Sequence, residues 1–486
     1  VGEHLFDDAA GFDGLPRAAK AGPGVFVGAE HPAGNLPVQL ANLAMVAVRG
    51  LEVPGIGRLH VVRSGLAEAL GDVAFARVPV SPLRARGLVD DLQAAKVVSE
   101  PFRGEPAIDR EALTAVVLGL SRLAEARPDV ASVDLNPLIV SDGCPVAVDA
   151  LVELGSAEVT SSPKSDGAAR TDREILERLD PLFKPKGIVV AGVSSHPGKF
   201  GFVAYHNLRR FGYRGELFPV NREGAEVLGA QTLRDIREVP EGAADLVFVC
   251  TPFQTNIDLL RAAAARGVRA AFIASGGYAE TGEEGRALQE ELVRTARELG
   301  MVVAGPNGQG VISTPLSMCA QIVAPYPPPG RISVASQSGN LVSSYLNYAT
   351  LTGVGVSKAI AAGNSAQLTL ADYLEYFAVD PDTAVGLTYL EGVGDGERFC
   401  EAASRMTEKK PLVLVKGGAE EAGARAAASH TGSLASDDRV FSGVCRQLGM
   451  TRAETVEDAY EYAATFATQP LPEGRNTVIF TTAGGW

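Results

Sequence analysis

The feature that most constrains the fold is a regular alternation of short apolar runs, glycine-containing loops and amphipathic segments between Lys186 and Ala304. Strands that alternate with helices at this spacing predict a parallel, doubly wound sheet with right-handed crossovers. The predicted strands are Gly187–Gly192, Glu216–Val220, Asp245–Cys250, Ala270–Ser275 and Met301–Ala304, and the predicted helices lie near Gly201–Phe211, Thr255–Arg266 and Glu283–Leu299.

The same alternation returns after a proline-rich bridge at Pro325–Gly330, which marks a domain boundary. The strands expected there are Arg331–Ala335, Val356–Ala361, Ala384–Tyr389 and Pro411–Lys416, with helices near Gly339–Thr350, Thr369–Phe377 and Arg398–Thr407. A further strand is expected at Thr477–Thr482, where the sequence stops as a third unit would begin. The sequence therefore predicts a multidomain α/β protein.

The N-terminal third follows a different pattern. Helices near Pro82–Ala95 and Arg110–Ala126 precede two strands, Ser132–Val140 and Pro145–Leu151, which a turn sequence joins. This order predicts a compact α+β unit. We expect the chain to divide into 1–60 (unassigned), 61–155 (α+β unit), 156–172 (polar linker), 173–325 and 331–468 (α/β units) and 475–486 (start of a truncated unit).

Charge and composition exclude several classes of function. The net charge of −14 argues against nucleic acid as a partner, because such proteins need clustered Lys and Arg. Five scattered cysteines form no CxxC pair, and no apolar run approaches the roughly 20 residues of a membrane span. We expect a cytoplasmic protein that does not enter a membrane. The missing initial methionine and the abrupt end suggest that part of its machinery is absent.

The loops at the strand ends of the first α/β unit suit a phosphorylated ligand. Gly192–Gly201 is a glycine-rich turn from strand to helix, which exposes amide groups at a positive helix end. It is not GxGxxG, and Asn221 ends the next strand where a dinucleotide site would need an acid, so a nicotinamide cofactor is disfavoured. Three more loops, Thr251–Pro252, Ser275–Gly277 and Gly305–Asn307, would line the same crevice. Taken singly, each is also explained as a tight turn.

The second α/β unit carries a candidate anion site and a candidate nucleophile. Ser336–Asn340 joins a strand to a helix, and Gly363–Asn364 follows the next strand. His430 lies among small residues after a buried strand, and a neutral imidazole there can accept a phosphoryl group. Glu391 follows the preceding strand and can orient the imidazole. Read alone, His430 and Glu391 are more often solvated loop residues.

These loops, in this order, resemble the CoA-binding and ligase modules of the nucleoside-diphosphate-forming acyl-CoA synthetases, which include the α subunit of succinyl-CoA synthetase. The resemblance covers about Leu182–Trp486 and implies a Rossmann-like CoA-binding domain followed by a flavodoxin-like domain. It makes His430 the phosphoryl carrier and Glu391 its orienting acid. The implied phosphate-binding residues are Ser336, Ser338, Gly339, Gly363 and Asn364. The implied CoA-binding residues are Gly192, Ser194, Ser195, Gly198, Lys199, Val220, Asn221, Thr251, Pro252, Ser275, Gly276 and Asn307.

The N-terminal α+β unit resembles the latter part of the superfamily's ATP-grasp module. By this resemblance Asn136 and Asp149 would hold Mg²⁺ on the nucleotide phosphates, although an Asn-Pro turn and an edge-strand Asp explain the two residues almost as well. The nucleotide-binding lysine strand and glycine-rich lid are not recognisable, and residues 1–60 match no family pattern. The ATP-grasp part is therefore expected to be partial.

The resemblance implies an acyl-CoA synthetase that interconverts acid, CoA and ATP with acyl-CoA, ADP and phosphate. Its ligands would be CoA, ATP or ADP, Mg²⁺ and a small carboxylic acid, and its protein partner a second copy or a chain that supplies the missing ATP-grasp part. Two other interpretations stay open: a CoA or acyl-CoA sensor with a degenerate ATP-grasp part, and a Rossmann oxidoreductase, which the missing GxGxxG opposes.

Overall fold

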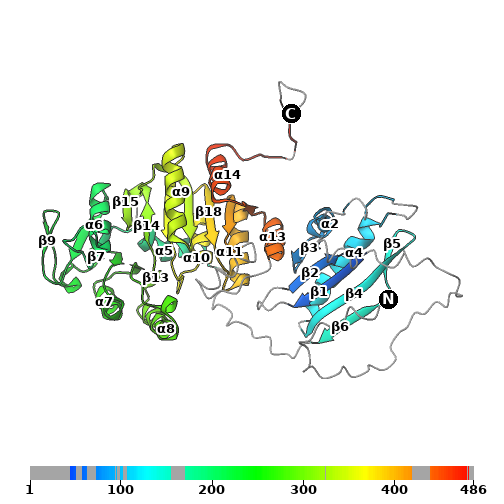
Figure 1. The fold of residues 1–486 in the computed structure, drawn as a ribbon, viewed down its shortest axis with the longest axis horizontal. Helices are drawn as coiled ribbons and strands as arrows, with labels where there is room; N and C mark the ends of the chain where they lie inside the picture. The colour runs from blue at the N-terminus through cyan, green and yellow to red at the C-terminus, as the bar shows by residue number, and fades with distance from the viewer. Residues whose placement is uncertain are drawn as a thin grey trace, which may run out of the picture. The chain divides into compact units, whose positions relative to one another are not determined.

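The computed structural model describes residues 44–50, 57–62, 73–92, 95, 99–101, 107–127, 129–154, 170–322, 325–418, 438–474, 476–478 and 480. All of them belong to one compact unit that spans residues 42–486. Within the described residues the strands form a six-, a five- and a seven-stranded sheet and a small two-stranded ribbon (Figure 1). Each described helix is too short or too polar to cross a membrane.

The N-terminal sheet is antiparallel, with strand order β3-β2-β1-β4-β5 and β6 also paired with β4. Its strands are β1 (Ala44–Gly50), β2 (Gly57–Val62), β3 (Val73–Arg77), β4 (Val130–Ser141), β5 (Cys144–Ala147) and β6 (Ala150–Leu154). Helices α2 (Pro82–Asp90) and α4 (Arg110–Ala126) share one hydrophobic cluster with this sheet. Helix α4 has the predicted bounds, and the Asp109 side chain caps it by accepting from two first-turn amides.

The strand predicted at Pro145–Leu151 is wrong as a single element, because β5 ends at Ala147 and β6 begins at Ala150. Both strands pair with β4, at Leu138↔Ala147 and Leu135↔Ala150. The interruption therefore lies opposite Asn136-Pro137. A proline has no N–H to donate to a strand ladder, which explains the break.

The second sheet is parallel, in the order β13-β12-β11-β7-β8, as the alternation predicts. It consists of β7 (Gly187–Ala191), β8 (Glu216–Val220), β11 (Leu246–Val249), β12 (Ala270–Ile273) and β13 (Val302–Ala304). Helices α5 (Asp172–Phe183) and α6 (Phe200–Arg210) share a core with one face, and α7 (Asn256–Ala264) and α8 (Glu283–Glu298) share a core with the other. Successive residues of β7 alternate between the two cores, as the pleat requires. The ribbon β9 (Glu226–Val227) and β10 (Ala230–Gln231) follows β8.

The third sheet has the order β15-β14-β17-β16-β18-β19-β20. Its strands are β14 (Gly310–Ser313), β15 (Met318–Gln321), β16 (Pro329–Ser336), β17 (Val356–Ala361), β18 (Val385–Leu390), β19 (Leu412–Lys416) and β20 (Thr451–Arg452). Helices α9 (Gly339–Thr352) and α14 (Val456–Thr468) cover one face, and α10 (Leu370–Val379) and α11 (Gly396–Lys409) cover the other (Figure 1). Helix α13 (Asp438–Gln447) precedes β20.

The hairpin β14–β15 was not predicted from the sequence. It precedes the proline-rich bridge, yet β14 pairs antiparallel with β17 of the third sheet. The strand predicted at Thr477–Thr482 is not formed at its described residues, 477, 478 and 480, which have no regular structure; its other residues lie outside the described ones. A strand exists only where a neighbour satisfies its backbone, and the local sequence does not encode that neighbour.

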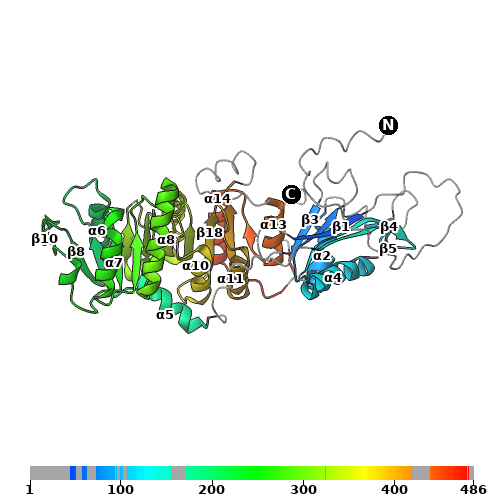
Figure 2. The same ribbon diagram turned by 90° about the horizontal axis from the view of Figure 1, so that it is seen from below.

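Helix α5 of the first α/β unit packs against helix α10 of the second. The Phe183 ring stacks on Tyr376 of α10 at a centroid distance of 4.9 Å, and Arg178 pairs with the buried Asp372 at 2.6 Å. Figure 2 shows α5 beside α10. One continuous hydrophobic cluster contains residues of the second sheet, the third sheet and α5. The two units therefore share a core, which fixes the loops of one against those of the other.

Candidate active site

The second sheet and the parallel part of the third sheet each have a topological switch point, and the predicted ligand loops lie there. In the second sheet the chain runs from β7 outward to β8 and then returns across β7 to β11. In the third sheet it runs from β16 to β17 and then crosses to β18. A crevice opens at the carboxyl ends of strands where the order reverses, and ligands of open α/β sheets bind in it.

The loop after β7 is organised by its own side chains. The Ser194 hydroxyl accepts from the His196 N–H at 3.0 Å, and His196 Nδ1 accepts from the Gly198 N–H at 3.1 Å. Lys199 is the N-cap of α6, and no side chain caps that end. The amides of the first turn therefore remain available to an anion, as a phosphate-binding loop requires.

This loop depends on close contact between two backbones. A Cβ added to Gly201 in α6 would lie 2.0 Å from the Gly192 carbonyl oxygen, and Gly192 itself has φ +85°. The predicted ligand residues Val220 and Asn221 brace the loop: the Val220 carbonyl accepts from the Gly192 N–H at 3.1 Å, and the Asn221 amide donates to the Val193 carbonyl at 2.6 Å. Ser195 is exposed in the same loop.

A buried asparagine that the sequence analysis missed connects two of the other loops. Asn256, fully buried at the start of α7, accepts from the Thr251 hydroxyl at 2.8 Å and donates to Ser275 Oγ at 3.0 Å and to the Tyr278 hydroxyl at 2.8 Å. Thr251 and Ser275 thereby receive fixed orientations, and Pro252 begins the short helix that leads into α7. A lone Asn at a helix start offers no signal by which to find it.

The neighbouring cysteine is not a nucleophile. Burial raises the pKa of the Cys250 thiol to about 12, so it stays protonated at neutral pH. Burial also raises the pKa of Tyr278 above its ordinary value, although its hydrogen bond from Asn256 opposes the shift. The groups at the end of β11 and beside it therefore act through hydrogen bonds and shape.

Direct hydrogen bonds join the loops of the two α/β units. The Asn307 N–H donates to the Ser275 carbonyl at 3.1 Å, and the Asn364 N–H donates to the Pro306 carbonyl at 2.9 Å. The Asn307 side chain also reaches Asn364, with Nδ2 and Oδ1 3.4 Å apart. Gly363, with φ +56°, leaves no room for a side chain, because its Cβ would lie 2.2 Å from the Pro306 carbonyl oxygen. The loop after β13 thus connects the loop after β12 to the loop after β17.

The predicted phosphate loop after β16 forms a compact turn. The Ser336 hydroxyl donates to the Ser338 carbonyl at 2.7 Å and accepts from the Ser338 N–H at 3.1 Å. Helix α9 begins at Gly339 without a side-chain cap, so its first amides are available to an anion. Gly339 packs against the Gln309 side chain: a Cβ there would lie 2.2 Å from it, so a larger residue would require Gln309 to move.

Gln337, within the same loop, is a second residue that the sequence analysis passed over. Its Oε1 accepts from the Glu391 N–H at 2.6 Å, its Nε2 donates to the Gly392 carbonyl at 3.1 Å, and its N–H donates to the Tyr389 carbonyl at 3.2 Å. It therefore fixes the loop that carries Glu391, a partly buried residue at the end of β18, against the phosphate loop. The two loops are 54 residues apart in the chain, so no local pattern reveals this contact.

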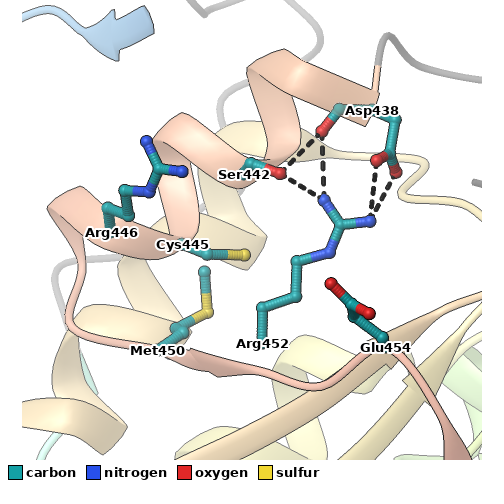
Figure 3. A pocket seen from close by; sticks show the side chains of 7 residues that line it. All are labelled: Asp438, Ser442, Cys445, Arg446, Met450, Arg452 and Glu454. Atoms are coloured by element: carbon teal, nitrogen blue, oxygen red, sulfur yellow. Dashed lines mark hydrogen bonds and ion pairs between the residues drawn. The ribbon is translucent and has the colours of Figure 1, made fainter. Parts of the chain in front are cut away.

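His430 lies outside the described residues, as does the whole segment 419–437. An ion pair connects the elements on either side of this segment. Lys416, the last residue of β19, has its Nζ 3.4 Å from Oδ1 of Asp438, the first residue of α13. Arg452 of β20 binds both carboxylate oxygens of Asp438, at 2.7 and 2.8 Å, and also Ser442 (Figure 3). Asp438, Ser442 and Arg452 line a pocket of about 420 Å³.

By backbone register, the two predicted metal-binding positions lie opposite each other at the interruption between β5 and β6. The pairs Leu138↔Ala147 and Leu135↔Ala150 share one register, which sets Asn136 of β4 opposite Asp149. Asp149 is exposed and accepts from the Ala150 N–H at 2.8 Å; the Asn136 side chain lies outside the described atoms. Among the described residues, no three His, Cys, Asp or Glu side chains gather as a metal cluster would.

Three domain families match this chain: an ATP-grasp domain at residues 61–154, a CoA binding domain at 186–314 and a succinyl-CoA ligase like flavodoxin domain at 329–466. The α subunit of acetate–CoA ligase (ADP-forming) I from Pyrococcus furiosus is 39% identical over 311 residues, which cover 63% of this chain and 67% of that protein. Acetate–CoA ligase (ADP-forming) II from Archaeoglobus fulgidus is 30% identical over 457 residues, 93% of this chain and 65% of that protein.

A solved structure agrees with these matches. The dinucleotide-forming acetyl-coenzyme A synthetase 1 of Ca. Korarchaeum cryptofilum, in complex with phosphate and ADP, aligns with a TM-score of 0.58 and 34% identity over 61% of this chain and 64% of that one. The chain thus spans about two thirds of the length of each of these three relatives.

Proposed function

Because the chain belongs to the ADP-forming acetate–CoA ligase family, we propose that it is the CoA-binding and phosphoryl-carrying part of an ADP-forming acyl-CoA synthetase. The observation that carries the proposal is the hydrogen-bonded junction at Asn307, which joins the CoA loop at Ser275 to the phosphate loop at Asn364. Transfer of an acyl group between a thiol and phosphate requires two such sites side by side. The overall exchange is acid, CoA and ATP with acyl-CoA, ADP and phosphate.

In the direction of ATP synthesis, a phosphate oxygen attacks the thioester carbonyl, the C–S bond breaks and CoA leaves as its thiolate. A ring nitrogen of His430 then attacks the phosphorus of the acyl phosphate, the P–O bond to the acyl group breaks, and the carboxylate leaves. The phosphoryl group passes from His430 to ADP. Glu391 orients the imidazole and stabilises its charged form.

The described residues contribute position and charge stabilisation, which are the main requirements of phosphoryl transfer. The uncapped first turn of α9 after Ser338 faces the developing negative charge, and the first turn of α6 after Lys199 holds phosphates of CoA. Val220 and Asn221 keep the loop before α6 in place, and Asn256 holds Thr251 and Ser275 in the two neighbouring loops.

Nucleotide chemistry would take place at the ATP-grasp part. Asn136 and Asp149 offer an amide and a carboxylate oxygen, which suit Mg²⁺, and the metal would neutralise charge on the nucleotide phosphates. A partner chain, or a second copy, would supply the ATP-grasp elements that this sequence does not show. The acid would be a small carboxylic acid, and the reaction would proceed in the cytoplasm.

Phosphate incorporation tests the proposal. With γ-labelled ATP and Mg²⁺, together with an ATP-grasp partner, the protein should acquire a label that is acid-labile and base-stable, and His430→Ala should abolish it. CoA affinity, measured by calorimetry, should be unchanged in that variant. Label that persists in His430→Ala would refute the phosphohistidine. CoA binding without any label would favour a CoA sensor instead.

A further inference from the structure

One carboxylate contacts both ligand loops, and the sequence analysis gave it no role. Glu280 Oε1 accepts from the Gly277 N–H at 2.6 Å and from the Tyr278 N–H at 3.2 Å, in the loop after β12. Its Oε2 accepts from Asn364 Nδ2 at 2.5 Å, in the loop after β17. The first loop belongs to the CoA-binding unit and the second to the flavodoxin-like unit.

Both N–H donors of the Asn364 side chain are engaged in this arrangement, so the side chain has no donor left for a phosphate. One Nδ2 hydrogen goes to Glu280, and the other goes to Gln289 Oε1 of α8 at 2.9 Å. Its Oδ1 faces Asn307 Nδ2. The Asn364 N–H already donates to the Pro306 carbonyl, so phosphate can be held here by the Gly363 N–H, while the Asn364 side-chain amide makes the contact between the loops.

The Glu280 carboxylate is closely packed against the backbone of the loop after β12. A Cβ added to Gly276 would lie 2.9 Å from Glu280 Oε1, so the carboxylate packs directly against the CoA loop. Burial alone would raise the pKa of Glu280, but the hydrogen bonds from Asn364 and from the Gly277 and Tyr278 amides outweigh it and lower the pKa. The group is therefore ionised at neutral pH, and both oxygens accept.

We propose that Glu280 is a positioning residue that holds the CoA-binding loop at Ser275–Gly277 in register with the phosphate loop at Gly363–Asn364. The inference rests on the proposed function, because that function requires both ligands in one crevice. A carboxylate has acceptors on both sides, whereas a carboxamide has one acceptor and one donor. Glu280→Gln should therefore keep the contact with the Gly277 N–H, but it places an N–H donor against the Asn364 Nδ2 donor, so the contact with the second loop is lost.

A swap of donor and acceptor tests the bridge directly. Asn364→Asp alone places two carboxylates within contact distance and repels the loops. In the double variant Glu280→Gln/Asn364→Asp, the introduced amide donates to the introduced carboxylate, while its oxygen still accepts from Gly277. Gln289 can rotate its amide to donate instead of accept. The double variant thus restores the bridge with the polarity reversed.

The readout is the Kd of CoA by isothermal titration calorimetry, with no turnover required. A hydrogen bond to a charged group accounts for about tenfold in affinity, so each single variant should bind CoA about tenfold more weakly. The double variant should return to within about threefold of the wild type. Glu284→Gln, an exposed residue of α8, is the control for the charge change and should bind as the wild type does.

The outcomes separate the two proposals. Wild-type affinity in both single variants, or a double variant as weak as the product of the two singles, would overturn the role of Glu280 and leave the proposed function intact. A wild-type protein that does not bind CoA would overturn both. Recovery of affinity in the double variant excludes general misfolding as the cause of the single losses.

Discussion

Gly201→Ala is expected to weaken CoA binding by opening the loop after β7. The added Cβ would lie 2.0 Å from the Gly192 carbonyl oxygen and 2.8 Å from its carbonyl carbon. Ordinary contact is about 3.5 Å, so the two backbones must separate by about 1.5 Å. That displacement exceeds the tolerance of a hydrogen bond, and a phosphate would lose one or two amides of the α6 first turn. At about 1.5–3 kcal/mol for each bond to a charged group, the loss of one bond should raise Kd about 10- to 150-fold, and the loss of two should raise it further.

Calorimetry with CoA measures this effect, and the apparent Tm of each variant reports on folding. Overpacking alone should cost about 1–3 kcal/mol of stability. Gly119→Ala is the matched control, because Gly119 is also a helical glycine and a Cβ there meets nothing within 4 Å. Unchanged CoA affinity in a folded Gly201→Ala protein would refute the assignment of this loop to the phosphates of CoA.

Two further predictions concern the contacts within and between the α/β units. Burial alone would raise the pKa of Asp372, but Arg178 and Arg398 outweigh it and lower the pKa. This carboxylate therefore stabilises the fold above about pH 4 and loses that contribution as the pH falls through its folded pKa. Asp372→Asn should make the apparent Tm less dependent on pH below about 4, and an unaltered pH profile of Tm would contradict the argument. Lys358 Nζ donates to Asp380 at 2.6 Å, and both side chains are fully buried. Lys358→Met should therefore lower the free energy of unfolding by about 3–5 kcal/mol and the apparent Tm by about 10 °C. A fall in Tm of only about 1 °C would show that the other partners of Asp380 are enough to stabilise its buried charge.

The alternation of apolar runs and glycine loops was sufficient to predict the parallel sheet of the CoA-binding unit. The strand Glu216–Val220 and the helix Arg110–Ala126 have the bounds that local pattern predicts. The loops at the strand ends also follow from sequence, because a strand, a glycine turn and a helix start are encoded by consecutive residues. The resemblance to the acyl-CoA synthetases rests on those same consecutive motifs, and family membership is confirmed.

Tertiary structure decided which residues hold those loops together. Glu280 and Asn364 are 84 residues apart in the chain, and Gln337 and Glu391 are 54 apart. Asn256 acquires its role only when its side chain is buried between the loops that carry Thr251 and Ser275. Periodicity and turn chemistry act over a few residues, whereas a hydrogen bond between loops depends on the packing of separate sheets around a shared core. The sequence therefore predicted the ligand loops, and only the fold showed which hydrogen bonds set these loops in register.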